Sequence, residues 1–524
     1  MQFFFRPLRW AVAVITLLVI SVLGFVAYDK QQGPPLEPWH TFVPRELDIK
    51  ALDQADWSDY LRAEDEIFTS LRTEVSQKLE PGSWVPYNRY FSESPVNPAR
   101  FAQDWNRSFV LEPSGDTVGA VVLLHGLTDS PYSGRHIARA YAEAGFVALG
   151  IRLPGHGTVP GGLTKVDWES WSAATRLAVR EASKRVGEKP LHIVGYSNGG
   201  ALAVKYVLDT IDDEQLPRVD RVVLISPMIG VTRFARFAGL AGLPAIFPAF
   251  AKSAWLGNQP EFNPFKYNSF PVNGARQSHR LSTALQAQIV RLSETKALGA
   301  LPPMLTFQSV VDNTVSTPAV ISALYEYLPA NGSELVLFDV NRNVKFEPLL
   351  RANSANALEQ MMPEPPSRFT LTVVANESVG SSEMLVRSIA AGQATERSRP
   401  LGIAYPAEIF SLSHVALPFP PEDGLYGLTP DPNDNFGVSL GNLVARGERG
   451  ALMMNLDTIF RVNSNPFFPF MLSRITENLL EAPKAPPTST EENMAPGRSA
   501  RASTRKQDLD QFFASGSNGD ASYP

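Results

Sequence analysis

A serine held in a glycine-rich turn is the feature that most constrains the fold of this chain. The apolar run 191–194 leads directly into the sequence GYSNGG at 195–200, and an alanine- and valine-rich helical pattern follows. Ser197 has a glycine two positions before it (Gly195) and two positions after it (Gly199), as a sharp strand-to-helix turn requires. The pattern predicts a strand–turn–helix unit of an α/β sheet, with the Ser197 hydroxyl at the positive end of the helix dipole.

Further short apolar runs, each bounded by turn residues, indicate the other strands. They cover residues 108–111, 120–124, 147–151, 222–225, 304–307 and 335–338. Helical patterns such as 136–144 and 168–186 separate the early runs. Strands that are apolar throughout and alternate with helices are typical of a parallel sheet covered on both faces. We therefore predict the α/β fold class with a mostly parallel central sheet.

The composition excludes several functional classes. The chain has 524 residues, with 47 Lys and Arg against 53 Asp and Glu, so its net charge of −6 offers no basic footprint for nucleic acid. It contains no cysteine, which excludes disulfides, thiolate metal sites and a cysteine nucleophile. We expect neither a metal nor a cofactor. The seven histidines are few enough to be considered one by one.

The N-terminal residues carry a membrane signal. Residues 10–28 form a run of 19 residues without a charge, preceded by Arg6 and Arg9. As a helix this run is about 28 Å long, close to the hydrocarbon thickness of a bilayer. We expect residues 1–30 to be an uncleaved signal anchor with a transmembrane helix, because bulky Phe25 stands where a cleaved signal peptide needs a small residue. The arginines favour a single-pass topology with the main domain outside the cytoplasm, on the periplasmic side in a bacterium.

Three more segments follow the anchor. Residues 31–105 form an N-terminal extension with an amphipathic helix over 53–79, which Asp53 can cap. Residues 106–481 form the main domain. Residues 482–524 are rich in proline, serine and charge and cannot bury enough apolar surface to offset the entropy of ordering, so we expect a disordered tail.

The motifs of the main domain resemble those of a known family. They are LLHGLTDSP at 123–131, RLPGHGT at 152–158 with VDWESW at 166–171, and GYSNGG at 195–200. With them, the stretch from about 108 to 419 resembles an α/β-hydrolase-fold serine esterase and is similar to the monoacylglycerol-lipase-like group. The resemblance implies the α/β-hydrolase fold and carboxylic-ester chemistry.

In this fold the catalytic residues follow the chain order serine, acid, histidine. The resemblance then makes Ser197 the nucleophile and Asp312, in the loop after the strand 304–307, the acid. Asp339, after the next strand, is the alternative acid, although the family pattern D-x-x-V favours Asp312. His414 is the one histidine after Asp312, so it is the only base that this order allows.

Two backbone N–H groups are the expected oxyanion donors. The fold carries one donor just after a strand that ends in His-Gly, here His125 and Gly126. We therefore expect the N–H of Leu127 to act together with the N–H of Asn198, the residue after the nucleophile. The side chain of His125 is expected to hold this loop by hydrogen bonds rather than to take part in the chemistry.

Two long stretches interrupt the family pattern. Residues from about 228 to 301 lie between two strands, where this fold carries a cap, and their aromatic side chains suggest an apolar acyl-binding cleft. These are Phe234, Phe237, Phe247, Phe250, Trp255, Phe262, Phe265 and Phe270, most of which we expect to pack in the core. The second stretch, from about 341 to 400, contributes to a gap of 102 residues between Asp312 and His414 (414 minus 312). It contains an expected strand at 369–374. Because of this insertion, the sequence does not identify which segment forms the last strand of the sheet.

The sequence thus predicts a membrane-anchored serine hydrolase. It would cleave carboxylic esters of acylglycerols or other lipid-like molecules through an acyl-enzyme. Acyl transfer and amide hydrolysis on the same triad are alternatives. A non-catalytic binding protein is an alternative from another class, but its expected signature is a broken triad, and here all three positions are filled. The expected partners are a small-molecule or lipid ester and the membrane, the latter through residues 10–28.

Overall fold

The computed structural model describes residues 33–80, 87–230, 248–343, 356–441 and 461–477, together with Leu479 and, nearer the N-terminus, Trp10, Val14, Thr16, Leu17, Ser21 and Tyr28. The chain divides into two units, residues 1–484 and 485–524. The second unit and the rest of the expected tail lie outside the described residues. So do residues 344–355 of the expected insertion, and Phe234, Phe237 and Phe247 of the expected cap.

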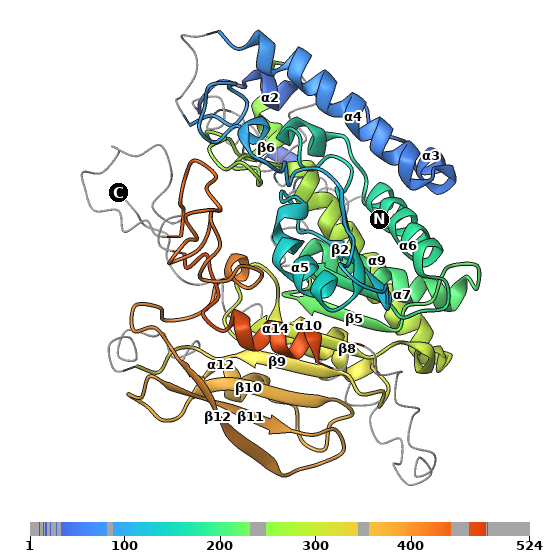
Figure 1. Cartoon of the computed structure of the whole chain (residues 1–524), viewed down its shortest axis with the longest axis vertical. Coiled ribbons are helices and arrows are strands. Elements are labelled where there is room, and N and C mark those ends of the chain that lie inside the picture. Colours follow the sequence, from blue (N-terminus) through green and yellow to red (C-terminus); the bar gives the residue numbers. More distant parts are fainter. Residues whose placement is uncertain are drawn as a thin grey trace. The chain divides into compact units, whose positions relative to one another are not determined.

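A ten-stranded sheet forms the centre of the first unit (Figure 1). In spatial order its strands are β1 (Phe109–Leu111), β3 (Phe146–Ile151), β2 (Gly119–Leu124), β4 (Leu191–Tyr196), β5 (Arg221–Ile225), β8 (Met304–Ser309), β9 (Glu334–Phe338), β10 (Thr370–Asn376), β11 (Glu383–Ile389) and β12 (Glu396–Ala404). The pairs from β3 to β10 are parallel, whereas the pairs β1–β3, β10–β11 and β11–β12 are antiparallel. The predicted α/β class with a mostly parallel sheet is confirmed.

Helices cover both faces of this sheet, because successive strand residues point to opposite sides. Val122 belongs to a core that includes side chains of α6 (Trp168–Val186), α7 (Asn198–Asp212), α9 (Val272–Glu294) and α10 (Thr317–Ala323). Its neighbour Val121 belongs to a second core with side chains of α5 (Arg135–Glu143) and α14 (Phe468–Thr476). The carboxyl ends of the parallel strands therefore meet at one edge of the sheet, where turns can bring functional side chains together.

Shorter elements complete the described residues. They are α12 (Ala357–Met361), the antiparallel pair β6 (Trp255–Gly257) and β7 (Phe270–Pro271), and the 3-10 turns η1 (Ser76–Lys78), η2 (Pro98–Arg100), η3 (Pro131–Gly134), η4 (Pro160–Thr164), η6 (Pro248–Ala254), η7 (Ala297–Ala300), η8 (Tyr325–Tyr327) and η10 (His414–Ala416). The N-terminal extension adds α2 (Pro38–Thr41), α3 (Ile49–Gln54) and α4 (Trp57–Glu74).

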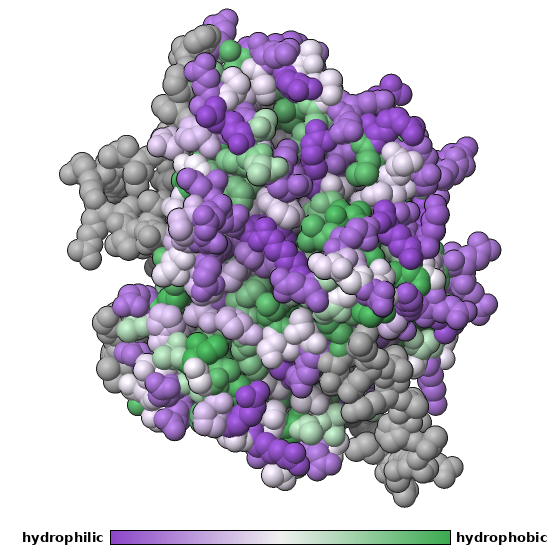
Figure 2. Space-filling model, viewed as in Figure 1, coloured by the Kyte–Doolittle hydropathy of each residue, from purple (hydrophilic) through white to green (hydrophobic). Residues whose placement is uncertain are grey.

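The amphipathic helix expected over 53–79 is shorter in the structure. Asp53 lies inside α3, whereas α4 begins after Asp56, whose carboxylate accepts a hydrogen bond from the N–H of Asp59 at 2.9 Å. Asp56 can cap the helix because its own backbone is extended, which leaves the side chain free to reach back over the first turn. The buried side of α4 includes Trp57 and Tyr60, and its outward side is polar, as the purple surface at the upper right of Figure 2 shows.

The insertion before His414 extends the central sheet. Strand β10 pairs in parallel with β9, and β11 and β12 continue outward as an antiparallel hairpin. The insertion begins and ends at one place, because the N–H of Asn341 donates to the carbonyl of Phe410 at 2.7 Å and its side-chain amide donates to the carbonyl of Ile409 at 2.8 Å. The insertion is long, but these contacts bring the chain back to the end of β9.

The prediction of a transmembrane helix at residues 10–28 is contradicted by the structure. Among the residues described, no helix is both long and apolar enough to cross a membrane. A span needs about 20 predominantly apolar residues in one helix. Helix α9 has that length, but it carries Arg276, Arg280 and Arg291, and most of residues 1–32 lie outside the described residues. The placement of the main domain outside the cytoplasm rests on the same segment and stays a prediction.

Candidate active site

The predicted strand–turn–helix unit is present, with Ser197 between β4 and α7. Its backbone has φ of 54° and ψ of −112°, a conformation that is costly for a residue with a side chain. Hydrogen bonds hold the turn, since the N–H of Ser197 donates to the carbonyl of Ile225 and its carbonyl accepts from the N–H of Met228, both at 3.0 Å. The residue is 8% exposed, so only a small part of it is open to solvent.

The glycines around Ser197 allow three backbone segments to touch. A Cβ on Gly199 would press into the carbonyl groups at the end of β2, with the carbonyl oxygen of His125 only 2.8 Å away. A Cβ on Gly195 would lie 2.6 Å from the Cα of Gly200. On the other side, a Cβ on Gly126 would lie 3.3 Å from the Cβ of Ser197. The segment 125–127 therefore lies directly against Ser197, and side chains at these glycines would separate the two.

Asp312 and His414 form a hydrogen-bonded pair at the same edge of the sheet. The distance from His414 Nδ1 to Asp312 Oδ2 is 2.9 Å, and the Asp312 side chain is fully buried. The other carboxylate oxygen accepts from the N–H groups of Thr314 and Val315, at 2.8 and 3.0 Å. Burial raises the pKa of Asp312, but His414 and these donors outweigh burial and hold the pKa below its usual value. Asp312 is therefore a carboxylate that can orient an imidazole.

Tyr196 connects the histidine to the turn that carries the serine. Its ring centroid lies 5.4 Å from that of His414, and its hydroxyl donates to the carbonyl of His414 at 3.4 Å. Within the described residues, no hydrogen bond joins Ser197 Oγ to the imidazole of His414. In enzymes without a bound substrate this contact is often long, and it shortens when the reacting complex forms.

The expected oxyanion donors are the N–H groups of Leu127 and Asn198. Asn198 is the first residue of α7, where backbone N–H groups have no partner within the helix. In the described part of the chain, neither N–H donates a backbone hydrogen bond. His125 holds the adjacent loop, because its Nδ1 donates to the carbonyl of Gly126 at 2.9 Å and its Nε2 accepts from the N–H of Leu153 at 3.0 Å. Burial lowers the pKa of His125 to about 3, so the ring is neutral.

Asp339, the alternative acid, lies elsewhere. Its carboxylate accepts from the Nε of Arg342 at 3.1 Å, and burial raises its pKa. It lines a separate cavity of about 430 Å³, together with residues of α12, β10 and β11 such as Leu358, Val373 and Arg387. The structure thus brings Asp312, and not Asp339, to His414.

One further side chain supports the Asp312–His414 pair. Gln308, near the end of β8, donates from Nε2 to Asp312 Oδ2 at 3.0 Å and to the hydroxyl of Thr317 at 3.0 Å. Gln308 could not be predicted from the sequence, because a glutamine at the end of an apolar strand carries no signal by itself. Among the described residues, no group of three His, Asp or Glu side chains is arranged to hold a metal ion.

The described aromatic residues of the expected cap are mainly packing residues. Trp255, Phe262 and Phe265 are buried, and the ring of Phe265 stacks on Tyr132 with centroids 4.2 Å apart. Phe270 is half-buried and lies beside the start of α9. A Cβ on Gly274 would be 3.2 Å from Phe270 and 3.9 Å from the side chain of Leu127, so an apolar surface adjoins the oxyanion segment.

Several known proteins are similar to this part of the chain. Residues 115–339 match the family model Hydrolase_4, described as serine aminopeptidase, S33. A thermostable monoacylglycerol lipase of Bacillus sp. (strain H-257) is 25% identical over 219 residues, which cover 41% of this chain and 79% of that protein. The solved chain from the metagenome-derived lipolytic enzymes LipS and LipT has 21% identity and a TM-score of 0.36, covering 45% of this chain and 88% of its own. A monoacylglycerol lipase of Paleococcus ferrophilus has 17% identity and a TM-score of 0.33, with 44% and 88% covered.

Proposed function

We propose that this chain, a member of the α/β-hydrolase family of esterases and lipases, hydrolyses lipid-like carboxylic esters, monoacylglycerols included, through Ser197, His414 and Asp312. The observation that carries the proposal is the 2.9 Å hydrogen bond between His414 and Asp312, at the sheet edge where Ser197 follows the end of β4. A nucleophile, a base and an orienting acid on three separate loops are the parts that acyl transfer to serine requires.

The reaction follows from the orientation of the imidazole. In the neutral imidazole the proton that Asp312 accepts sits on Nδ1 of His414, so Nε2 carries none and can act as the base. His414 takes the proton of Ser197 Oγ as that oxygen attacks the acyl carbon, and Asp312 stabilises the imidazolium. The carbonyl oxygen becomes an oxyanion that the N–H groups of Leu127 and Asn198 stabilise. The imidazolium then protonates the leaving alcohol, and water repeats the cycle on the acyl-enzyme.

The apolar surface beside the oxyanion segment supports an acyl substrate. Leu127, Phe270 and the first turn of α9 adjoin one another at this place, so an alkyl chain bound there would be removed from water. Each buried methylene is worth about 0.8 kcal/mol, which favours longer acyl chains until the surface ends. The similar lipase of Bacillus sp. acts, by its name, on monoacylglycerols.

The purified full chain tests the proposal. It should hydrolyse p-nitrophenyl butyrate, and Ser197→Ala should lower kcat by at least about 10⁴-fold and remove labelling by a fluorophosphonate. Ser226→Ala is the matched control, because Ser226 is also buried, also follows a strand and also has a positive φ of 42°. Labelling that survives in Ser197→Ala, or that disappears in Ser226→Ala, would overturn the assignment of the nucleophile.

A substrate series tests the chemical class. Monoacylglycerols of increasing chain length should give rising kcat/KM, and an aminoacyl p-nitroanilide should give little turnover. A preference for the anilide would favour amide hydrolysis on the same residues. Transfer of the acyl group to added glycerol in preference to water would favour acyl transfer.

A further inference from the structure

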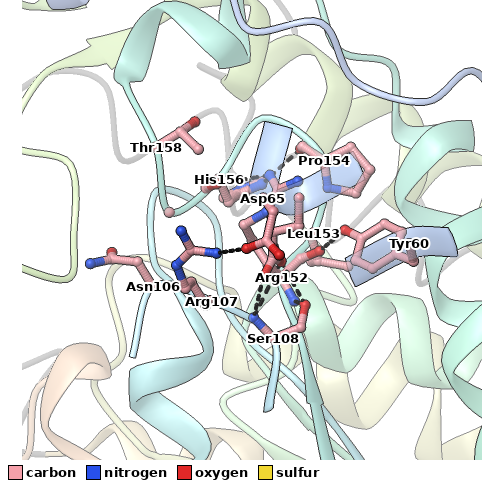
Figure 3. Close-up of polar contacts among 12 residues, drawn as sticks. Tyr60, Asp65, Asn106, Arg107, Ser108, Arg152, Leu153, Pro154, His156 and Thr158 are labelled. Atoms are coloured by element: carbon pink, nitrogen blue, oxygen red, sulfur yellow. Dashed lines mark hydrogen bonds and ion pairs between the residues drawn. The ribbon is translucent and has the colours of Figure 1, made fainter. Parts of the chain in front are cut away.

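A buried arginine joins the N-terminal extension to the loop that follows β3. Arg152 is 1% exposed, and its guanidinium makes a bidentate pair with the carboxylate of Glu46, at 2.8 and 2.9 Å. Its Nε donates to Glu64 of α4 at 3.1 Å. Figure 3 shows Tyr60 of α4 beside Arg152, with the hydroxyl of Tyr60 donating to the carbonyl of Arg152. Two carboxylates of the extension thus meet one cation of the main domain.

The same contacts fix the backbone of the loop 153–158. Glu46 Oε1 accepts from the N–H of Gly155 at 2.7 Å as well as from Arg152. The guanidinium also donates to the carbonyl of His156 at 3.1 Å, on the far side of the turn (Figure 3). Gly155 has a φ of 78°, a conformation that glycine adopts without steric cost. The Glu46 side chain therefore stabilises this turn directly, although Glu46 lies 109 positions away from Gly155 in the chain.

The loop in turn fixes the oxyanion segment. The N–H of Leu153 donates to Nε2 of His125, whose Nδ1 donates to the carbonyl of Gly126. The ring of His156 packs edge-on against that of His125, with centroids 5.0 Å apart. Gly126 lies against Ser197 and precedes Leu127, an expected oxyanion donor. Hydrogen bonds and the short backbone segment 152–155 therefore connect Glu46, through Arg152 and Gly155, to His125 and to the peptide that carries the Leu127 N–H.

We propose that Glu46 of the N-terminal extension is a positioning residue for the oxyanion hole, acting through Arg152, Gly155 and His125. The inference rests on the proposed function, since it concerns the same site. A donor must point at the place where the oxyanion forms, and a small displacement weakens its interaction with the transition state more than with the substrate. Loss of Glu46 therefore lowers kcat and leaves KM nearly unchanged.

Electrostatics explain why Arg152 needs this partner. The guanidinium is buried next to the neutral His125, and a buried cation that loses a carboxylate moves toward water or toward another acceptor. Glu64 alone cannot hold it in place, because Glu64 also accepts from the N–H and hydroxyl of Ser108. Without Glu46, Arg152 changes position, and the N–H of Gly155 loses its acceptor.

The experiment compares full-length Glu46→Ala, Glu46→Gln and Asp53→Asn with the unchanged chain. Asp53 is the matched control, because it lies in the same extension and makes a bidentate pair with Arg176 of α6, at 2.9 Å for both bonds, but does not contact the loop 153–158. The measurements are kcat and KM on p-nitrophenyl butyrate, and inhibition by a trifluoromethyl ketone. Such a ketone forms a tetrahedral oxyanion on the nucleophile, so its affinity reports on the oxyanion hole directly.

In Glu46→Ala we expect kcat to fall about tenfold, the affinity for the ketone to fall by the same factor, and KM to change by less than about twofold. Glu46→Gln should show a smaller loss of the same kind, because its amide oxygen can still accept from Gly155, and it replaces the alanine variant if that one does not fold. Asp53→Asn should equal the unchanged chain. Equal effects of the Glu46 and Asp53 variants, or a change in KM alone, would overturn the positioning role. An unchanged chain that is inactive and unlabelled at Ser197 would overturn the proposed function itself.

Discussion

His414 Nδ1 lies 2.9 Å from Asp312 Oδ2, although the two residues are 102 positions apart in the chain. After β9, the part of the chain between Asn341 and Phe410 adds β10, β11 and β12 to the sheet and then returns to its starting point at Asn341. An insertion that begins and ends at one place does not change the distance between the elements on either side of it. The pair between base and acid can therefore form in a chain with a long insertion.

Asp312→Asn should remove most of the activity without unfolding the protein. With its oxygen still on the N–H groups of Thr314 and Val315, the asparagine turns its NH2 group toward Nδ1 of His414. This group donates to Nδ1 and carries no negative charge, so His414 is held in the wrong tautomer and the imidazolium is not stabilised. We expect kcat on p-nitrophenyl butyrate to fall by about 10⁴-fold. Circular dichroism should show an unchanged fold, because the amide oxygen can still accept from the N–H groups of Thr314 and Val315.

Asp339→Asn is the control for that variant. Asp339 is buried like Asp312 and also makes an ion pair, with Arg342, but it does not contact His414. Its kcat should stay within about threefold of the unchanged chain, as expected for a residue outside the catalytic unit. A large loss of kcat in Asp339→Asn, with Asp312→Asn nearly active, would mean that the acid has been assigned to the wrong strand.

Asn341→Ala should lower the stability and, in addition, the activity. The fully buried Asn341 side chain donates to the carbonyls of Pro406 and Ile409 and accepts from Asn376 and the N–H of Asn343. Its removal leaves buried partners unsatisfied, which costs about 2–4 kcal/mol of unfolding free energy. Because these bonds close the insertion next to the segment that leads to His414, we also expect kcat to fall. Urea unfolding and kcat on the folded protein are the two measurements.

Asn331→Ala is the control that separates the loss of stability from the loss of activity. Asn331 makes the same number of side-chain bonds, donating to the carbonyls of Leu301 and Pro302 and accepting from the N–H and hydroxyl of Ser333. It lies between β8 and β9, at the opposite ends of these strands from Asp312. Its unfolding free energy should fall, while kcat measured on the folded protein should not. If kcat falls equally in both variants, closure of the insertion has no special effect on His414.

The sequence predicts the part of the fold that rests on local patterns. All of the expected parallel strands are present, since each is an apolar run that is buried on both faces. The turn at Ser197 could be predicted because its glycines are needed by backbone contacts within a short stretch of chain. The order of the acid and the histidine in the chain reduced the choice of base to His414.

The features that could not be predicted from the sequence depend on long-range contacts or have no local sequence pattern. Strand β12 has the sequence ERSRPLGIA, and most of it is exposed, so it shows no apolar run and forms a strand only because β11 pairs with it. Nothing near Glu46 in the sequence indicates that it binds Arg152, since the two meet only after the extension folds onto the main domain. Hydropathy alone likewise predicts a membrane span at 10–28, and the structure provides no such helix among the described residues.

Gly199→Ala should be strongly destabilising, in contrast to alanine at other glycines. Its Cβ would press against the carbonyl groups of Leu124 and His125, which belong to the backbone and cannot rotate away. Forcing them apart should cost about 3 kcal/mol and should displace the Asn198 N–H from the oxyanion segment. Gly299→Ala is the control, because no atom lies within 4 Å of its added Cβ, and it should be neutral or stabilising by about 0.5 kcal/mol. Thermal unfolding of both variants checks the difference.

The buried histidines make the stability depend on pH. Burial lowers the pKa of His40 and His136 to about 4 and that of His125 and His192 to about 3, and it also holds the pKa of His156 well below its usual value. The unfolded chain therefore binds protons as the pH falls through 6.5, whereas the folded chain does not do so until the pH is near 4. Between about pH 6.5 and 4 these histidines should lower the unfolding free energy, each by up to about 1.4 kcal/mol per pH unit, whereas above about pH 7 they are neutral in both states and add no pH dependence.

His192→Gln removes one of these titrating histidines and so measures its contribution to the pH dependence of the unfolding free energy. His192 is enclosed by Tyr141 and Phe146, far from the turn at Ser197 along β4, and a glutamine there can still accept from the hydroxyl of Tyr141. Between pH 7.5 and 5 the variant should lose about 2 kcal/mol less unfolding free energy than the unchanged chain, because one titrating group with a lowered pKa is missing. Urea unfolding at the two pH values measures this difference directly. An equal loss in both proteins would show that His192 binds its proton as readily in the folded state as in the unfolded state.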